Sequence, residues 1–124
     1  MNPPAVGEFC WNELVSTEVA GSAAFYSRLF GWTTETEEMA PGATYTIFKR
    51  GDTQAGGLLA SPAPGIPSHW LPYVTVTDCD ASAAEAVGLG AELCVPPTDI
   101  SVGRIAVLRD PQGAVFGLFK PKAP

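Results

Sequence analysis

The sequence predicts an α+β domain made of two consecutive βαβββ modules. The first observation behind this prediction is an internal repeat, because the segment that starts at Trp11 aligns with the segment that starts at Leu71, an offset of 60 residues. The second is the order of patterns within each repeat, where one alternating apolar segment precedes a helical segment and three further short strands. Residues 1–124 are therefore expected to form one domain.

The first module covers about residues 8–60. Its first strand is "FCWNELVS", and a polar residue before "AGSAAFYSRLFG" starts a helix that Gly31 can end, since glycine accepts the left-handed terminal conformation. The stripe expected to be buried on this helix consists of Ala24, Phe25, Leu29 and Phe30. The three remaining strands are expected at about 32–38, 44–50 and 54–60.

A connector, "SPAPGIPSH" at residues 61–69, separates the modules, and its Pro and Gly content predicts an extended linker. The second module covers about 70–121. Its elements are expected in the same order, at 71–77, 80–88, 91–95, 103–109 and 114–120. The turn "RDPQG" is the clearest turn signal, since Pro presets one dihedral angle and Gly permits the other.

Composition and charge exclude several functional classes. Apolar residues make up 46% and charged residues 16%, which is typical of a soluble globular chain. The net charge of −6 and the seven scattered basic residues argue against a nucleic-acid partner. No apolar run approaches the roughly 20 residues that span a bilayer, and no signal peptide is seen, so a cytoplasmic protein without a membrane partner is expected.

The three cysteines, Cys10, Cys79 and Cys94, are an odd number without CxxC spacing. This pattern predicts neither a disulfide framework nor a thiolate zinc site. They are expected to be small buried apolar residues.

Paired βαβββ modules, with "FYSRLFGW" closing the first helix and "DPQGAVFGLFKP" near the end, resemble the vicinal oxygen chelate superfamily of glyoxalase I, bleomycin resistance proteins and extradiol dioxygenases. The resemblance covers about residues 8–121. Within the superfamily, "HWLPYVTVTD" and "CWNEL" are most similar to a glyoxalase-like, hydroxylase-accessory subgroup. The resemblance implies a curved, eight-stranded half-barrel sheet around a cavity, which holds one divalent ion in metal-using relatives.

Carried onto this sequence by register, the four ligand positions implied by the resemblance are Trp11, Gly57, Leu71 and Gly117. None of these side chains can donate an electron pair, so we expect no metal and no other cofactor. The only histidine, His69, precedes Leu71 by two residues. A register slip of that size would bring it into the cavity, and this possibility stays open.

An apolar cavity without an ion is expected to take an organic ligand. Strand alternation places Glu13 on the face of Trp11, and Tyr73 and Thr75 on the face of Leu71, while the two glycines are expected to leave room. Trp11 and Tyr73 either stack on a flat ligand or fill the cavity as core. The candidate ligand-binding residues are Trp11, Glu13, Tyr45, Gly57, Leu71, Tyr73, Arg104, Gly117 and Phe119.

Glu13 is the candidate catalytic residue, because a carboxylate on an apolar strand face is costly unless it has a partner or a function. It can accept a hydrogen bond from a ligand or act as a general base. Alternatively it pairs with Arg104 or Arg28, or lies near the rim of the sheet. The facing of Tyr45 and of Arg104 is not fixed by the sequence.

Two functions follow from these observations. The first is a metal-free protein that binds a hydrophobic or aromatic small molecule for sequestration, resistance or an accessory role. The alternative is an enzyme of lyase, isomerase or dioxygenase type, either metal-free with Glu13 as base or metal-dependent through an unforeseen ligand set. The resemblance also implies a homodimer, with the cavity either within one chain or across two.

Overall fold

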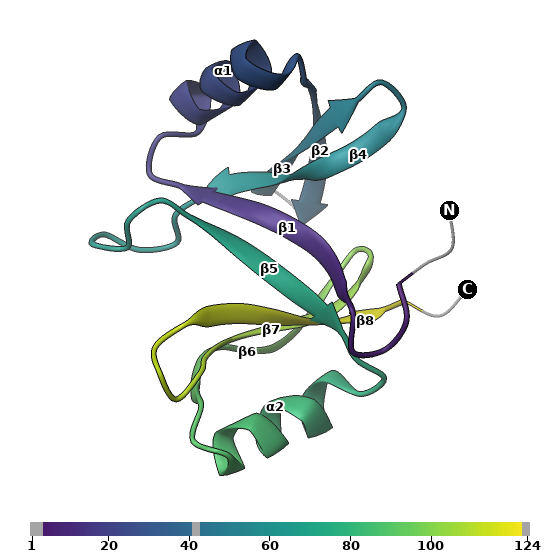
Figure 1. Ribbon diagram of the computed structural model, residues 1–124, viewed down its shortest axis with the longest axis vertical. Helices are drawn as coiled ribbons and strands as arrows, with labels where there is room; N and C mark the ends of the chain where they lie inside the picture. Colours follow the sequence, from purple (N-terminus) through teal and green to yellow (C-terminus); the bar gives the residue numbers. More distant parts are fainter. Residues whose placement is uncertain (1–3, 41–42, 123–124) are drawn as a thin grey trace. The chain divides into compact units, whose positions relative to one another are not determined.

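The structure is a computed structural model that describes residues 4–40 and 43–122. Its elements follow the order βαβββ twice (Figure 1). The first module comprises β1 (Phe9–Ser16), α1 (Val19–Phe30), β2 (Thr33–Ala40), β3 (Ala43–Arg50) and β4 (Thr53–Ala60). The second comprises β5 (His69–Thr75), α2 (Cys79–Gly88), β6 (Glu92–Ile100), β7 (Gly103–Arg109) and β8 (Val115–Pro121). The predicted α+β class and topology are confirmed, whereas the half-barrel shape stays a prediction.

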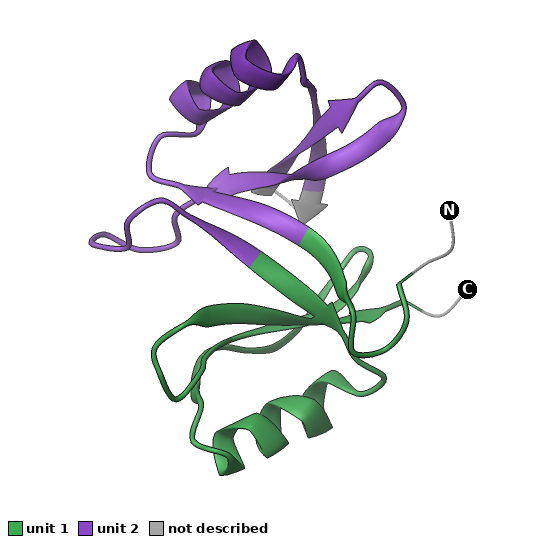
Figure 2. Cartoon of the chain, in the orientation of Figure 1, with its two compact units in different colours: residues 1–11, 72–124 green, residues 12–71 purple. Residues whose placement is uncertain are grey.

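The chain divides into two compact units, residues 12–71 and residues 1–11 with 72–124 (Figure 2). The hydrogen-bonded order is β2-β3-β4-β1 in the first module and β5-β8-β7-β6 in the second. In each module the first and last strands run parallel, and the other pairs are antiparallel. Strands β1 and β5 both continue from one unit into the other.

The repeat seen in the sequence is present in the packing. Phe48 and Leu108, which occupy equivalent positions, are both fully buried. The equivalent residues Leu58 and Leu118 are 1% and 6% exposed. Each of these residues belongs to the core beneath the helix of its own module. The offset of 60 residues therefore reflects two copies of one packing scheme.

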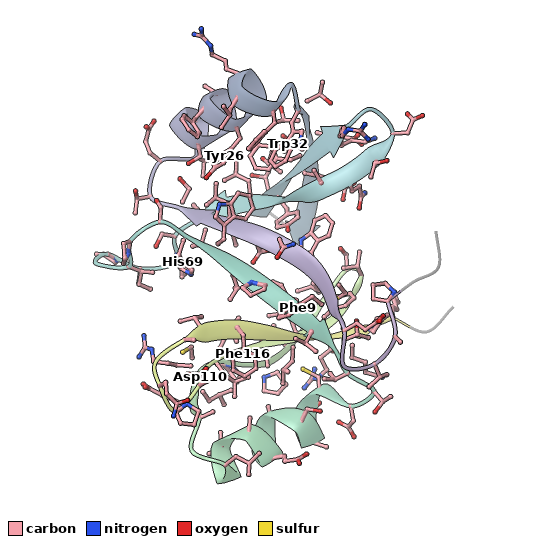
Figure 3. All side chains as sticks on the ribbon, viewed as in Figure 1. Phe9, Tyr26, Trp32, His69, Asp110 and Phe116 are labelled. Carbon is pink, nitrogen blue, oxygen red and sulfur yellow. The ribbon has the colours of Figure 1, made fainter. Side chains whose placement is uncertain are left out.

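Helix α1 turns a different side to the sheet than the sequence suggested. Ala24, Phe25, Leu29 and Phe30 are exposed, so the prediction that they form the buried stripe is wrong. The side that packs on the sheet contains Val19, Ala23 and Tyr26. Tyr26 decides this orientation, because its ring lies 6.1 Å from that of Trp32 and 5.9 Å from that of Phe48 (Figure 3). The helix ends at Gly31 in the left-handed conformation, as predicted.

Helix α2 is held at both its start and its inner side. The carboxylate of Asp78 accepts a hydrogen bond from the backbone N–H of Ala81 at 3.0 Å, which caps the helix. Cys79 and Ala83 are buried against Leu108 and its neighbours on the sheet. Within the described part of the chain, neither helix is long and apolar enough to cross a membrane.

Strand β6 extends to Ile100, beyond the predicted end at residue 95, although it contains Pro96 and Pro97. Its register with β7 shifts between Val95 and Thr98, and β6 is the last strand in the sheet order. An edge strand with a bulge accepts proline because one side of it needs no ladder hydrogen bond.

The predicted "RDPQG" turn is confirmed. The Asp110 carboxylate accepts hydrogen bonds from the N–H groups of Gln112 and Ala114, both at 2.9 Å. Gly113 has a φ of 97°, which few other residues adopt. This turn fixes where β8 begins, and hence where Gly117 lies.

The cysteines occupy three different environments. Cys79 is buried, and burial raises the pKa of its thiol, so it behaves as the small apolar residue that was expected. The thiol of Cys10 is half-buried and donates to the Tyr73 carbonyl oxygen at 3.5 Å. Cys94 is exposed, so the expectation of burial is wrong for this residue, which lies on the edge strand β6.

Candidate functional site

In the unit of residues 12–71, the structure places Glu13 and Tyr45 on one face of the sheet around Gly57. Glu13 is 8% exposed and lies directly beside Gly57 in the parallel register of β1 and β4. A Cβ added at Gly57 would meet the hydroxyl of Tyr45. Because side chains of directly paired residues share a face, the Tyr45 phenol and the Glu13 carboxylate are neighbours on that face. This arrangement settles the facing of Tyr45, which the sequence left open.

The other unit repeats this geometry with different chemistry. Tyr73 pairs with Gly117 and is 6% exposed, and its ring lies where a Cβ of Gly117 would be. Tyr73 thus occupies the place that Glu13 has in the first module. The expectation that the two glycines leave empty room is wrong, since tyrosine side chains cover both of them.

Strand alternation placed Thr75 on this face, but Thr75 was not among the candidate ligand-binding residues. It follows Tyr73 on the same face of β5, is 5% exposed, and pairs across the sheet with Phe119. Its backbone is satisfied, because its N–H donates to the Glu8 carbonyl and its carbonyl accepts from the Gly7 N–H, both at 2.9 Å. Its side-chain hydroxyl, however, finds no hydrogen-bond partner within residues 4–40 and 43–122. The alternation of β5 gave its facing, but no sequence signal reveals an unpaired hydroxyl.

The remaining candidates fall into two groups. Trp11 and Phe119, both half-buried, belong with Tyr73 and Gly117 to the unit of residues 1–11 and 72–124. Leu71, which is 4% exposed, belongs with Glu13, Tyr45 and Gly57 to the unit of residues 12–71. Trp11, Tyr73 and Phe119, called the aromatic group below, therefore belong to one unit, whereas Glu13 and Tyr45 belong to the other.

Arg104 does not join the aromatic group. It shares its face of β7 with Ala106 and Leu108, which pack beneath α2, whereas Val107 on the opposite face pairs with Gly117. Arg104 therefore lies on the opposite face of β7 from the residue that pairs with Gly117, and its role in ligand binding stays a prediction.

The guanidinium of Arg104 is instead engaged by two acidic side chains. Its Nε and Nη2 atoms donate to the carboxylate of Asp80 at 2.8 and 3.0 Å, and its Nη1 atom donates to Asp99 at 2.8 Å. The hydrogen bonds from Arg104 lower the pKa of the Asp80 carboxyl. This network joins the first turn of α2 to the sheet.

The donor set does not fit the divalent ion of metal-using relatives. The residues directly beside the two glycines are Glu13 and Tyr73, and not Trp11 and Leu71. This register therefore adds only one possible metal ligand, the Glu13 carboxylate, to the four expected positions. Nowhere in the described part of the chain do three His, Cys, Asp or Glu side chains gather as metal ligands would. His69 donates from Nδ1 to the Pro67 carbonyl at 2.8 Å, a local bond within the connector.

Two open hollows lie away from these groups. One, of about 360 Å³, is lined by residues around the β6–β7 turn and the end of β8, including Arg104 and Lys120. The other, of about 350 Å³, is lined by Ser16, Thr17 and the segment 60–65. Neither hollow contains the tyrosine-covered glycines.

The comparison that decides the family is a match of the glyoxalase-like domain family to residues 9–119, nearly the whole chain. The chain belongs to this family. The resemblance to the vicinal oxygen chelate superfamily is thereby confirmed, and the tandem βαβββ modules agree with it.

Several relatives are longer proteins. The chain is 45% identical over 93% of its length to the Mycobacterium tuberculosis protein named "Putative glyoxylase CFP32", covering 44% of that protein. It is 35% identical over 94% of its length to the "Anthracycline biosynthesis protein DnrV" of Streptomyces peucetius, covering 48% of that protein. The chain thus spans less than half the length of the curated relatives it matches.

Solved structures show the same fold at low identity. Methylmalonyl-CoA epimerase from Mycobacterium tuberculosis superimposes with a TM-score of 0.66 at 15% identity, over 99% of this chain and 94% of that one. The hypothetical protein BH1468 from Bacillus halodurans gives 0.66 at 14% identity, over 95% and 96% of the two chains. At these identities the likeness concerns the fold alone.

Proposed function

We propose that this domain binds a planar, largely apolar organic molecule, with no resident metal ion, against the face of β5 and β8 that carries Tyr73, Thr75 and Phe119. The buried, unpaired hydroxyl of Thr75 is the observation that carries the proposal. A cytoplasmic protein that sequesters such a molecule, or assists an enzyme acting on it, is the role we infer.

The free-energy cost of burying the Thr75 hydroxyl without a hydrogen-bond partner is the first argument for this proposal. A buried hydroxyl without a partner costs about 1–3 kcal/mol, so its presence beside Phe119 is unfavourable for folding alone. A carbonyl or hydroxyl oxygen of a ligand would accept or donate the missing hydrogen bond. The half-buried rings of Trp11 and Phe119 supply the apolar part, since each stacked ring adds about 0.5–1.5 kcal/mol beyond burial.

The relatives supply a second support. Two proteins at 35% and 34% identity are named for anthracycline biosynthesis. Anthracyclines contain a planar fused-ring system that bears carbonyl and phenol oxygens, which is the chemistry that an aromatic face with one unpaired hydroxyl would recognise. The proposal that the ligand binds without an ion follows from the donor set, since the tryptophan, leucine and glycines at the expected ligand positions offer no electron pair.

The test uses quinizarin, a planar dihydroxyanthraquinone, as the probe, with binding measured by quenching of tryptophan fluorescence and by calorimetry. We expect Thr75→Val and Phe119→Ala each to weaken binding about tenfold, equivalent to about 1.4 kcal/mol. Val102→Ala is the matched control, because Val102 is an exposed residue in the same unit. Chelators and added divalent ions should leave the affinity unchanged. Absence of binding, or binding that requires an ion, would contradict the proposal.

A second candidate function is proton transfer, with Glu13 as general base. It is favoured by one observation, the Tyr45 phenol placed over Gly57 next to the buried Glu13 carboxylate. Such a pair can take a proton from a carbon beside a carbonyl group while the phenol donates a hydrogen bond to the carbonyl oxygen. The proton would move from carbon to the carboxylate, and return from the carboxylic acid.

Deuterium uptake into dihydroxyacetone in heavy water, followed by NMR, tests this candidate. We expect Glu13→Gln to lower the uptake rate at least about a hundredfold, the usual contribution of a general base. Tyr45→Phe should lower it less. If the wild-type protein exchanges the probe no faster than buffer does, the second candidate is wrong, whatever the outcome of the quinizarin experiment.

A further inference from the structure

The hollow around the β6–β7 turn has no part in the proposed ligand site. It has a volume of about 360 Å³. Neither Thr75 nor Glu13 belongs to its lining, so a molecule that fills it is bound separately from a ligand at those residues. Cations, one carboxylate and apolar side chains line it, namely Arg104, Lys120, Lys122, Asp99, Ile100 and Pro121.

This hollow gathers positive charge in an acidic chain. The sequence has seven lysines and arginines and a net charge of −6. Three of these seven cations, Arg104, Lys120 and Lys122, line the one hollow, and the only carboxylate in its lining is that of Asp99. Such a surplus of positive charge in a concave surface attracts anions.

The fold anchors both lysines at the hollow. Lys120 pairs directly with Arg104 in the register of β7 and β8, so their side chains lie next to each other on one face of the sheet. The backbone N–H of Lys122 donates to the Val102 carbonyl oxygen at 3.0 Å, which ties the chain after β8 to the β6–β7 turn. The backbone of each lysine is therefore held in place, although both side chains are exposed.

Arg104 is already engaged by carboxylates of the chain. Its Nε and Nη2 atoms, which form the fork that matches a flat carboxylate, donate to Asp80, and its Nη1 atom donates to Asp99. A guanidinium has five N–H donors, so these three hydrogen bonds leave two for a ligand. The two carboxylates also offset the charge of Arg104, so an incoming anion depends mainly on the lysines.

Lys120 and Lys122 are the cations that remain for a ligand, since neither makes an ion pair within residues 4–40 and 43–122. The hydrogen bond from Arg104 is the main cause of the lowered pKa of the Asp80 carboxyl, and the charge of Lys120 adds to it. Lys120 thus lies close to this network. An ammonium group is a point charge without a preferred plane, which suits a tetrahedral phosphate better than a flat carboxylate.

We propose that this hollow binds a small phosphate monoester, with Lys120 and Lys122 at the phosphate group and Ile100 and Pro121 beside the organic part. The volume favours a monoester over inorganic phosphate, because sites for small organic molecules measure about 300–1,000 Å³. The apolar side chains in the lining are a second reason, since inorganic phosphate would gain nothing from them. The site does not depend on the proposed function, because quinizarin carries no phosphate.

Calorimetric titration with phenyl phosphate at low ionic strength tests the proposal. We expect saturable binding that Lys120→Gln and Lys122→Gln each weaken about tenfold, as for the loss of one charge-assisted contact. Lys49→Gln is the matched control, because it removes the same charge from a lysine that pairs with Glu35 in the other unit. Circular dichroism checks that the variants fold. Absence of binding, or an equal loss of affinity in Lys49→Gln, would overturn the site.

Two related compounds and an NMR titration test the class of ligand and its position. Phenol should not bind, and inorganic phosphate should bind more weakly than phenyl phosphate. Equal affinity for inorganic phosphate and phenyl phosphate would overturn the assignment to a monoester. Amide chemical shifts should change at the β6–β7 turn and at the end of β8. Changes confined to β5 would place the phenyl ring at the proposed ligand site instead, and would overturn this one.

Discussion

Replacing Gly117 with alanine should destabilise the domain by about 2–3 kcal/mol, a large effect for one methyl group. The added Cβ would overlap the ring of Tyr73, which is 6% exposed and pairs directly with Gly117 in the sheet. The ring has little freedom to move, since the space around a buried side chain is already filled. Urea denaturation monitored by fluorescence would measure the loss as a lower midpoint at unchanged slope.

Two comparisons isolate the contact with Tyr73. Gly88→Ala is the control, because a Cβ at Gly88 in α2 meets nothing within 4 Å, and we expect it to stabilise the domain by about 0.5–1 kcal/mol. The double variant Gly117→Ala with Tyr73→Ala should be more stable than the sum of the single effects predicts, because the methyl group then has room. Additive effects in this cycle would show that Gly117 is needed for another reason.

The topology could be predicted from the sequence because it rests on patterns that each segment carries by itself. The alternation of "FCWNELVS", the glycine after α1 and the turn at Asp110 each determine a local element, and the repeat joins the elements into modules. Non-local packing could not be predicted in the same way. On α1 the sequence pattern favoured the side of Phe25, whereas the rings of Trp32, just before β2, and of Phe48 in β3 hold the side of Tyr26 against the sheet.

The candidate site was predictable to the extent that strand alternation governs it. Alternation correctly placed Tyr73 and Thr75 on one face of β5, but a glycine in a sequence shows only that a Cβ is missing and not what fills the space. The tyrosines over Gly57 and Gly117 come from different strands in the two modules. The repeat therefore gave no warning that both glycines would be covered.

Removing the buried hydroxyl of Ser16 and removing that of Thr75 should change the stability of the domain in opposite directions. Ser16 is 1% exposed, its hydroxyl accepts from the N–H of Glu18 at 3.0 Å, and it is hydrogen-bonded to the hydroxyl of Ser22 at 2.7 Å. Ser16→Ala should cost about 1–3 kcal/mol, because it leaves donors at the start of α1 without a partner. Thr75→Val should instead stabilise the domain by about 1 kcal/mol, since it removes a hydroxyl that has no partner in the described chain.

Thermal and urea denaturation of both variants, set beside the quinizarin affinity of Thr75→Val, separate a structural threonine from a binding one. If Thr75 is kept for a ligand, the valine variant gains stability and loses affinity, the exchange expected when a site retains a polar group that folding does not need. If Thr75→Val loses stability as Ser16→Ala does, the hydroxyl has a partner in the folded protein and the proposed function loses its main support. A gain in stability with unchanged affinity would place the ligand away from β5 and favour the group around Glu13 instead.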